Sequence, residues 1–374
     1  MVDFDEFVVM REDFLRELNI AVDKVIKEKE SIKLDYDLIE KSLGVMLRNV
    51  RNLEVNPISA LTPIKKEDMI KITLDFFKSI DSEFHKKAIN TILQQNENIK
   101  MNIYNIHEVK DFSKEDELGL LKYTHNGNVE CRSGFARVNV PTRREVYSEE
   151  QKILSGDECL LEDLYTIVHE TTHLFDLDLE KDRIDRDQLQ GGEGKRKEKT
   201  TRELLGEATT IVFEDLLSEY LLNNTSISKY AIQEMYALRL NSNLQDARMV
   251  YSKLLLAKEK GKSGEITSEF VEKLMRDNGF TTQYIRKIAN DIIHNPRGML
   301  YQKRYALGAL ISPTIIKKYK EEGVGALKEY LEEAKNENFE GALKNLGIEI
   351  NDQGLNELIK NLREHITNLN MKAR

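Results

Sequence analysis

Two histidines and a glutamate stand in the order His-Glu-x-x-His at positions 169–173. Residues four apart lie on one face of an α-helix, so the imidazoles of His169 and His173 can reach the same point. Two neutral imidazoles supply half of a tetrahedral zinc site, and the carboxylate of Glu170 can take a proton from a water at the metal. The motif arises by chance in roughly one chain of this length in a hundred. It predicts a catalytic zinc site and a hydrolytic reaction.

A catalytic zinc site needs a third protein ligand, and the residues after the motif limit where it can come from. A histidine or aspartate six residues after His173 would complete a compact motif, but Leu179 stands there. The third ligand must therefore come from another element. Asp176, one helical turn beyond His173, is better interpreted as a group that orients a ligand or as an ordinary surface carboxylate.

The segment 200–223 is apolar on nearly all sides and carries a single polar stripe. Charged groups on a buried helix need a partner, and a metal ion is one of the few that suffices. Glu203 has another explanation, because it forms a capping-box pattern with Thr200. Glu207 has none, and it is the predicted third zinc ligand. The members of the stripe are Glu203, Glu207, Thr210 and Glu214.

The elements that must position these residues are a helix, a loop and a small sheet. The histidines are predicted on a helix from about residue 157 to 178, followed by a polar loop over 178–199 that is solvated or forms a lid over substrate. A small antiparallel sheet is predicted over 119–141, where an Asn126-Gly127 step favours a hairpin. The strand 134–140 is predicted as an edge that pairs with extended peptide substrate, or as part of a sheet that only covers the core.

Helical periodicity dominates the rest of the chain, and the predicted fold class is mainly α with the small antiparallel sheet beside the metal helix. Residues 1–115 are expected to form an N-terminal helical region, and 116–374 a catalytic region continuous with it around a cleft. The predicted helices are 3–30, 35–53, 66–97, 227–259, 267–275, 281–293, 299–320, 324–335 and 339–363.

Composition excludes several classes of protein. With 374 residues, 40% hydrophobic and 32% charged, the chain can bury a large core under a solvated surface. A net charge of −9 argues against a general nucleic-acid binder. No apolar run reaches the roughly 18 residues of a membrane span, and the acidic N-terminus does not resemble a secretion signal. Two cysteines are too few for a disulfide framework. We therefore expect a cytoplasmic protein that binds neither nucleic acid nor membrane, with export independent of an N-terminal signal left open.

Three motifs resemble the oligoendopeptidase F and thimet oligopeptidase family of zinc metallopeptidases. The stretch from Glu207 to Glu214 is similar to a family motif in which the zinc-binding glutamate precedes small residues and a second glutamate. The stretch from His294 to Gly308 resembles a family segment with a histidine, a proline, closely spaced tyrosines and a Tyr-Ala-x-Gly step. Gly134-Phe135 is similar to the family's edge strand. The C-terminal segments 325–331 and 342–350 echo family helices, so the resemblance covers roughly residues 119–350.

The chain departs from the family pattern at several positions. Thr172 stands where the family usually has glycine, and Asp176 stands where it often has histidine. Gln302 and Lys303 interrupt the tyrosine-rich run, and the chain is shorter than typical members. Because of these departures, the family's substrate length limit and its oxyanion-stabilising group do not carry over directly to this chain. The metal site is not affected by them.

The resemblance implies a zincin-type helical fold with one Zn²⁺ per chain, held by His169, His173 and Glu207. Glu170 is then the general base, and Glu214 orients a ligand histidine. Tyr305 is implied as the donor to the oxyanion, with Tyr301 and His294 as helpers. The alternatives are core packing for the tyrosines and a helix-entry cap for His294.

The predicted function is hydrolysis of peptide bonds, with oligopeptides bound in a cleft as the expected substrates. One alternative is a protease aimed at a single protein target, as in a toxin or effector. Another is a non-catalytic, zinc-bearing protein that binds peptides. The presence of Glu170 speaks against the second alternative, because a structural zinc site does not need that carboxylate. Nothing in the sequence indicates an oligomeric state.

Overall fold

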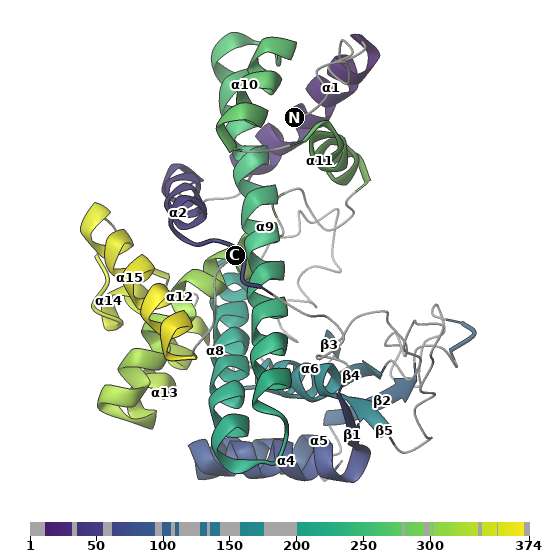
Figure 1. The fold of residues 1–374 in the computed structure, drawn as a ribbon, viewed down its shortest axis with the longest axis vertical. Coiled ribbons are helices and arrows are strands. Elements are labelled where there is room, and N and C mark those ends of the chain that lie inside the picture. Colours follow the sequence, from purple (N-terminus) through teal and green to yellow (C-terminus); the bar gives the residue numbers. More distant parts are fainter. Residues whose placement is uncertain are drawn as a thin grey trace. The chain divides into compact units, whose positions relative to one another are not determined.

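The computed structural model describes residues 12–31, 36–54, 62–93, 99–105, 109–111, 128–132, 135–142, 158–175, 200–278, 281–294, 300, 302–335, 339–349 and 351–369. Most of these residues are helical, and the strands are few and short (Figure 1). The predicted mainly α class is therefore confirmed.

The helices before the predicted metal ligands are α1 (Glu12–Ser31), α2 (Tyr36–Asn49), α4 (Lys66–Ile80) and α5 (Ser82–Ile92). The helices of the site region are α6 (Leu161–Thr172), α8 (Thr200–Asn224) and α9 (Lys229–Ser263). They are followed by α10 (Ser268–Asn278), α11 (Thr282–His294), α12 (Lys303–Glu322), α13 (Val324–Lys335), α14 (Phe339–Asn345) and α15 (Asp352–Asn368). The strands are β1 (Pro63–Lys65), β2 (Ile99–Asn105), β3 (Asn128–Arg132), β4 (Phe135–Thr142) and β5 (Glu158–Leu160).

The chain divides into two compact units. Unit 1 comprises Met1–Val50 and Asn243–Leu307, and unit 2 comprises Arg51–Ser242 and Gly308–Arg374. The helices α4 and α5 belong to unit 2 together with α6 and α8, and the predicted division into residues 1–115 and 116–374 stays a prediction. The helices α9 and α12 contribute residues to both units.

An aromatic cluster explains why α4 and α5 belong with the predicted metal helices. Phe84 of α5 stacks on Phe175 with ring centroids 4.8 Å apart. Phe175, just after α6, meets Phe213 of α8 edge-on at 5.4 Å. Phe77 of α4 contacts both, at 5.2 Å from Phe175 and 5.8 Å from Phe213. Each ring pair contributes about 0.5–1.5 kcal/mol beyond its burial. The cluster therefore fixes the end of α6 against the middle of α8.

The helix that carries the histidine motif is shorter than predicted. Residues Glu158–Leu160 form β5 and pair antiparallel with β1, so the helix begins at Leu161 rather than near 157. The Asp163 carboxylate accepts the backbone N–H of Leu160 at 2.7 Å and closes the first turn. The helix ends at Thr172, yet His173 keeps right-handed helical angles of φ −55° and ψ −23°. Its side chain therefore stays in register with that of His169.

The sheet near the metal helix has a different strand order from the one predicted. The strand β4 lies in the centre, parallel to β2 on one side and antiparallel to β3 on the other. The prediction of an edge strand over 134–140 is therefore wrong. The sequence pattern shows that a strand is present, but its neighbour β2 comes from a segment about 30 residues upstream. The Asn126-Gly127 step lies outside the described residues.

Two predicted helices are interrupted. The segment 66–97 breaks at Asp81, whose backbone is extended and whose carboxylate accepts the N–H of Glu83 at 2.8 Å. The segment 339–363 breaks after Gly347, which adopts a positive φ of 71°. The next helix is capped by Asn351 through the N–H of Gly354, where a Cβ atom would lie 1.9 Å from the Glu349 carbonyl oxygen.

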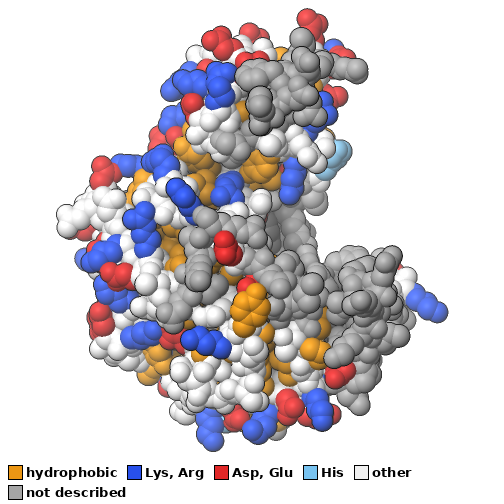
Figure 2. All heavy atoms as spheres, viewed as in Figure 1, with side chains coloured by type: hydrophobic (Ala, Val, Ile, Leu, Met, Phe, Trp, Pro, Cys, Tyr) orange, Lys and Arg blue, Asp and Glu red, His pale blue; other side chains and the backbone are white. Residues whose placement is uncertain are grey.

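The surface carries charges of both signs. On the face shown in Figure 2, basic and acidic side chains are interspersed, and hydrophobic side chains appear in small groups. None of the described helices is long and apolar enough to cross a membrane.

Candidate metal centre

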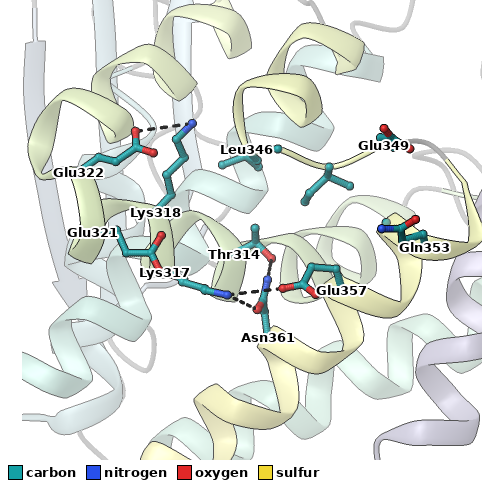
Figure 3. A pocket seen from close by; sticks show the side chains of 13 residues that line it. Thr314, Lys317, Lys318, Glu321, Glu322, Leu346, Glu349, Gln353, Glu357 and Asn361 are labelled. Carbon is teal, nitrogen blue, oxygen red and sulfur yellow. Dashed lines mark hydrogen bonds and ion pairs between the residues drawn. The ribbon is translucent and has the colours of Figure 1, made fainter.

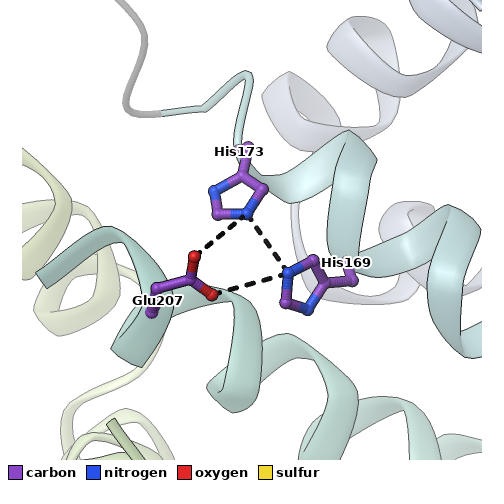
Figure 4. Close-up of side chains that lie close together, drawn as sticks. All are labelled: His169, His173 and Glu207. Carbon is purple, nitrogen blue, oxygen red and sulfur yellow. Dashed lines mark hydrogen bonds and ion pairs between the residues drawn. The ribbon is translucent and has the colours of Figure 1, made fainter. Parts of the chain in front are cut away.

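The three predicted ligands come together in unit 2 (Figure 4). The Nε2 atoms of His169 and His173 are 3.2 Å apart. The carboxylate of Glu207 lies 3.6 Å from Nε2 of His169 and 3.9 Å from Nε2 of His173. One atom from each residue therefore points to a common position, as the sequence predicts.

The separations between these atoms fit a zinc ion. Zinc binds nitrogen and oxygen at about 2.0–2.1 Å with tetrahedral geometry, which places neighbouring ligand atoms about 3.3–3.4 Å apart. The 3.2 Å between the two imidazole nitrogens and the 3.6 Å from His169 Nε2 to Oε2 of Glu207 lie on either side of this value, and Oε1 of Glu207 faces His173 at 3.9 Å. Two imidazoles and a carboxylate are also a donor set of catalytic zinc sites, which leave a fourth position open.

Close helix packing brings Glu207 to the histidines. Around Glu207, both Ala208 and Val212 are fully buried, and Glu207 itself is only 3% exposed. At Gly308 of α12, a Cβ atom would lie 2.7 Å from Cδ1 of Ile211 and 3.2 Å from the backbone of Ala208. Glycine therefore lets α12 pack directly against α8 beside the third ligand. This is the glycine of the Tyr-Ala-x-Gly step.

Glu214 holds the other ring nitrogen of His169. Its Oε1 lies 2.6 Å from Nδ1 of His169 and accepts the Nδ1 hydrogen. Nε2 is thereby left with a lone pair for a metal. Although burial acts to raise the pKa of Glu214, the charges of Arg239 and His169 lower it from 4.5 to about 2. Glu214 is therefore a carboxylate throughout the physiological range, and the structure gives it the orienting position that the resemblance implies.

The site favours positive charge. Burial acts to lower the pKa of His169, but the hydrogen bond to Glu214 and the charges of Glu214, Glu170 and Glu207 outweigh it and raise the pKa to about 9. All three glutamates are at most 5% exposed. The same three carboxylates that stabilise the proton on His169 would stabilise a cation bound between the imidazoles. A divalent metal and that proton would compete for the site.

Glu170, the predicted general base, is a buried carboxylate next to His169 in the sequence. It is 5% exposed, and its Oε2 has no hydrogen-bond partner among the described residues. Burial raises its pKa from 4.5 to about 7, with Glu207 and Glu214 adding to the effect and His169 opposing it. A buried polar atom without a partner is uncommon in a folded protein and indicates a ligand or water that is bound during function.

The remaining predicted site residues belong to unit 1 or lie outside the described residues. Tyr305, in unit 1, is partly buried, and its hydroxyl accepts from Arg304 at 3.0 Å. His294 is exposed and ends α11, also in unit 1. Tyr301, Asp176 and the 178–199 loop lie outside the described residues, as does the side chain of Glu203. The proposed roles of Tyr305, Tyr301 and His294 stay predictions.

Arg239 contacts the site through Glu214, and the sequence did not reveal it. Its Nε donates to Oε2 of Glu214 at 2.6 Å, and a second guanidinium nitrogen donates to Oε1. Arg239 lies on the 35-residue helix α9, where many charged side chains alternate with apolar ones. Its spacing carries no motif, so only the packing of α9 against α8 identifies it.

A cavity of about 460 Å³ lies between α12 and α15 in unit 2, apart from the three predicted ligands (Figure 3). Its two lysines already have partners within the protein. Lys317 contacts Glu357 at 3.5 Å and Asn361 at 3.2 Å. Lys318 donates to the carbonyl of Asn345 and lies 3.7 Å from Glu322. The cavity therefore has the character of a solvated groove with internal ion pairs.

The fold is similar to that of a solved structure described as a putative peptidase. The "putative peptidase from Chlamydophila abortus" matches with a TM-score of 0.50 and 13% sequence identity, over 95% of this chain and 55% of that chain. The "putative oligoendopeptidase F from Bacillus anthracis str. Ames" matches with a TM-score of 0.47 and 8% identity, over 90% of this chain and 57% of that chain. This chain thus spans little more than half the length of these structures. The sequence matches no protein-family model and no curated protein.

Proposed function

We propose that the chain is a zinc-dependent metallopeptidase that hydrolyses peptide bonds. The observation that carries this proposal is the convergence of His169, His173 and Glu207 on one position, at separations that suit zinc. The buried Glu170 follows His169 in the sequence, and its Oε2 has no hydrogen-bond partner among the described residues, which supports hydrolysis rather than structural metal binding. The fold shared with a peptidase structure agrees with this interpretation.

The chemistry that zinc supplies when bound is Lewis acidity, which lowers the pKa of a water towards about 7 and polarises a peptide carbonyl. The protein's own residues then move the protons. Glu170, with a pKa near 7, takes a proton from the attacking water and returns it to the leaving amine. Glu214 keeps the His169 imidazole in the Nδ1-protonated tautomer while this occurs.

Oligopeptides are the substrates that the family resemblance favours. A donor to the tetrahedral oxyanion is also needed, and the resemblance assigns it to Tyr305, with Tyr301 and His294 as helpers. Because β4 is the central strand of its sheet, β2 and β3 are the outer strands among the described residues. Any pairing of substrate with this sheet would have to use one of them.

Two other functions remain to be distinguished by experiment. A protease specific for one folded protein would use the same residues, and it would ignore short peptides. A non-catalytic, zinc-bearing protein would bind peptides without turnover. The burial of Glu170 favours an enzyme, since a buried carboxylate costs folding free energy and carboxyl groups with a raised pKa cluster at catalytic sites. Cytoplasmic location stays a prediction.

The test is to incubate the zinc-loaded protein with a quenched-fluorescent peptide library and, separately, with intact proteins. We expect cleavage of peptides that stops with a metal chelator and returns when zinc is added. Cleavage of one intact protein alone would favour the specific protease. Zinc binding without any cleavage would favour the peptide-binding protein and contradict the proposal.

A further inference from the structure

Arg239 makes a forked contact with the carboxylate that orients His169. The Nε of Arg239 donates to one oxygen of Glu214 at 2.6 Å, and a terminal nitrogen donates to the other. That second oxygen also accepts the Nδ1 hydrogen of His169 at 2.6 Å. Contacts therefore run without interruption from α9 through α8 to the predicted metal ligand on α6.

The guanidinium is itself held in place. It lies over the ring of Tyr165 on α6, with 5.5 Å between its central carbon and the ring centroid. The Tyr165 hydroxyl lies 2.7 Å from Oγ of Ser218, and Ser218 in turn donates to the backbone carbonyl of Glu214 at 3.2 Å. The plane of the Glu214 carboxylate is thus set by Arg239 from one side and by His169 from the other.

We propose that Arg239 is a positioning residue of the metal centre, which fixes Glu214 and through it the imidazole of His169, and so sets the affinity for zinc. The inference rests on the proposed function, because it takes His169 to be a zinc ligand. A rotated imidazole would direct its Nε2 away from His173 and Glu207, and metal affinity falls when such an orienting contact is lost. Lysine cannot replace the two-pronged contact, since its ammonium is a point donor.

The experiment measures the affinity of the metal-free protein for Zn²⁺ by competition with a chelator, and the visible spectrum of the Co²⁺ form. We expect Arg239→Met to weaken zinc binding by about 10–100-fold and to alter the cobalt bands. Arg239→Lys should fall between Met and wild type. Lys320→Met is the matched control. It removes a cation 2.6 Å from Glu219, another carboxylate on α8, and it should leave zinc affinity unchanged.

A double variant separates positioning from general stabilisation. Because Arg239 acts through Glu214, we expect Arg239→Met to change zinc affinity by less than about two-fold in a Glu214→Gln background. Additive losses would overturn the proposal, and so would wild-type affinity in Arg239→Met. If Arg239→Met does not fold, wild-type affinity in Arg239→Lys overturns it instead.

These outcomes are distinguishable from failure of the proposed function. A wild-type protein that binds zinc but cleaves nothing contradicts the peptidase, while the zinc affinities of the variants still decide the role of Arg239. A wild-type protein that does not bind zinc overturns both.

Discussion

Two clusters of buried charged side chains, one described in each unit, balance their charge differently. In unit 1 the fully buried Lys253 donates to Asp291 and lies 3.4 Å from Oε1 of Gln302. In unit 2 three buried glutamates surround His169, and Arg239 contacts one of them, Glu214. In the first cluster the protein itself supplies both signs of charge. In the second, the three glutamates raise the pKa of His169 to about 9, so the cluster favours the binding of a further cation.

The difference shows which buried charges are structural. Burial lowers the pKa of Lys253, while Asp291, Glu28 and Asp246 oppose that shift, so the ion pair compensates for the burial of the ammonium. Removing one partner of such a pair destabilises the protein, and the intact pair needs no ligand. Among the described residues, Oε2 of Glu170 has no hydrogen-bond partner, and the carboxylate interacts electrostatically with His169 and Glu207. A buried carboxyl group with a raised pKa next to possible metal ligands indicates a functional site rather than a structural ion pair.

The largest expected effect comes from Glu170→Gln. Removing the base should lower kcat by about 10²–10⁴-fold while zinc content stays at the wild-type level. It should not destabilise the metal-free protein, because the neutral amide is less unfavourable to bury than a carboxylate. Steady-state kinetics and metal analysis check this, with Glu219→Gln on α8 as the control. Retained activity would show that Glu170 is not the base and would weaken the contrast between the clusters.

Lys253→Met should have the opposite profile. We expect the free energy of unfolding to fall by about 2–3 kcal/mol, because Asp291 loses its partner, with zinc affinity unchanged. Chemical denaturation checks this. Lys258→Met is the control, because its ammonium is 2.6 Å from Glu40 but the side chain is 43% exposed, and we expect a loss of about 1 kcal/mol or less. Equal effects of the two variants would contradict a structural role for the buried pair.

The smallest effect should be a change in pH dependence for Asp246→Asn. Burial raises the pKa of Asp246 from 3.8 to about 7, with Asp291 adding and Lys253 opposing. The stability that a raised carboxyl pKa provides is present below about pH 4 and is lost as the pH rises through 7. From pH 4 to 7 the free energy of unfolding of the wild type should therefore fall relative to that of the variant, by less than about 1.4 kcal/mol per pH unit. Thermal unfolding of both proteins at each pH checks this. An equal dependence of stability on pH in the wild type and the variant would show that Asp246 titrates normally.

The sequence predicted the part of the site that depends on local spacing. His169, Glu170 and His173 follow from helical periodicity, and Glu207 followed from a polar stripe on an apolar helix. His169, His173 and Glu207 lie together in the structure as expected. The start of the metal helix was misjudged because β5 pairs with β1, a strand almost 100 residues earlier.

What the sequence could not show depends on contacts between distant segments. The position of β4 at the centre of its sheet depends on β2, and the grouping of α4 and α5 with the metal helices depends on aromatic packing. Arg239 reaches Glu214 only because α9 packs beside α8. Periodicity describes one element at a time, and it contains no information about which element is the neighbour.

The most direct test of the account is zinc titration of the metal-free wild type and of Glu207→Ala. We predict one zinc per chain for the wild type and loss of stoichiometric binding in the variant, because two imidazoles alone leave the site incomplete. Equal stoichiometry and affinity in the two proteins would contradict the account and show that Glu207 is not a ligand.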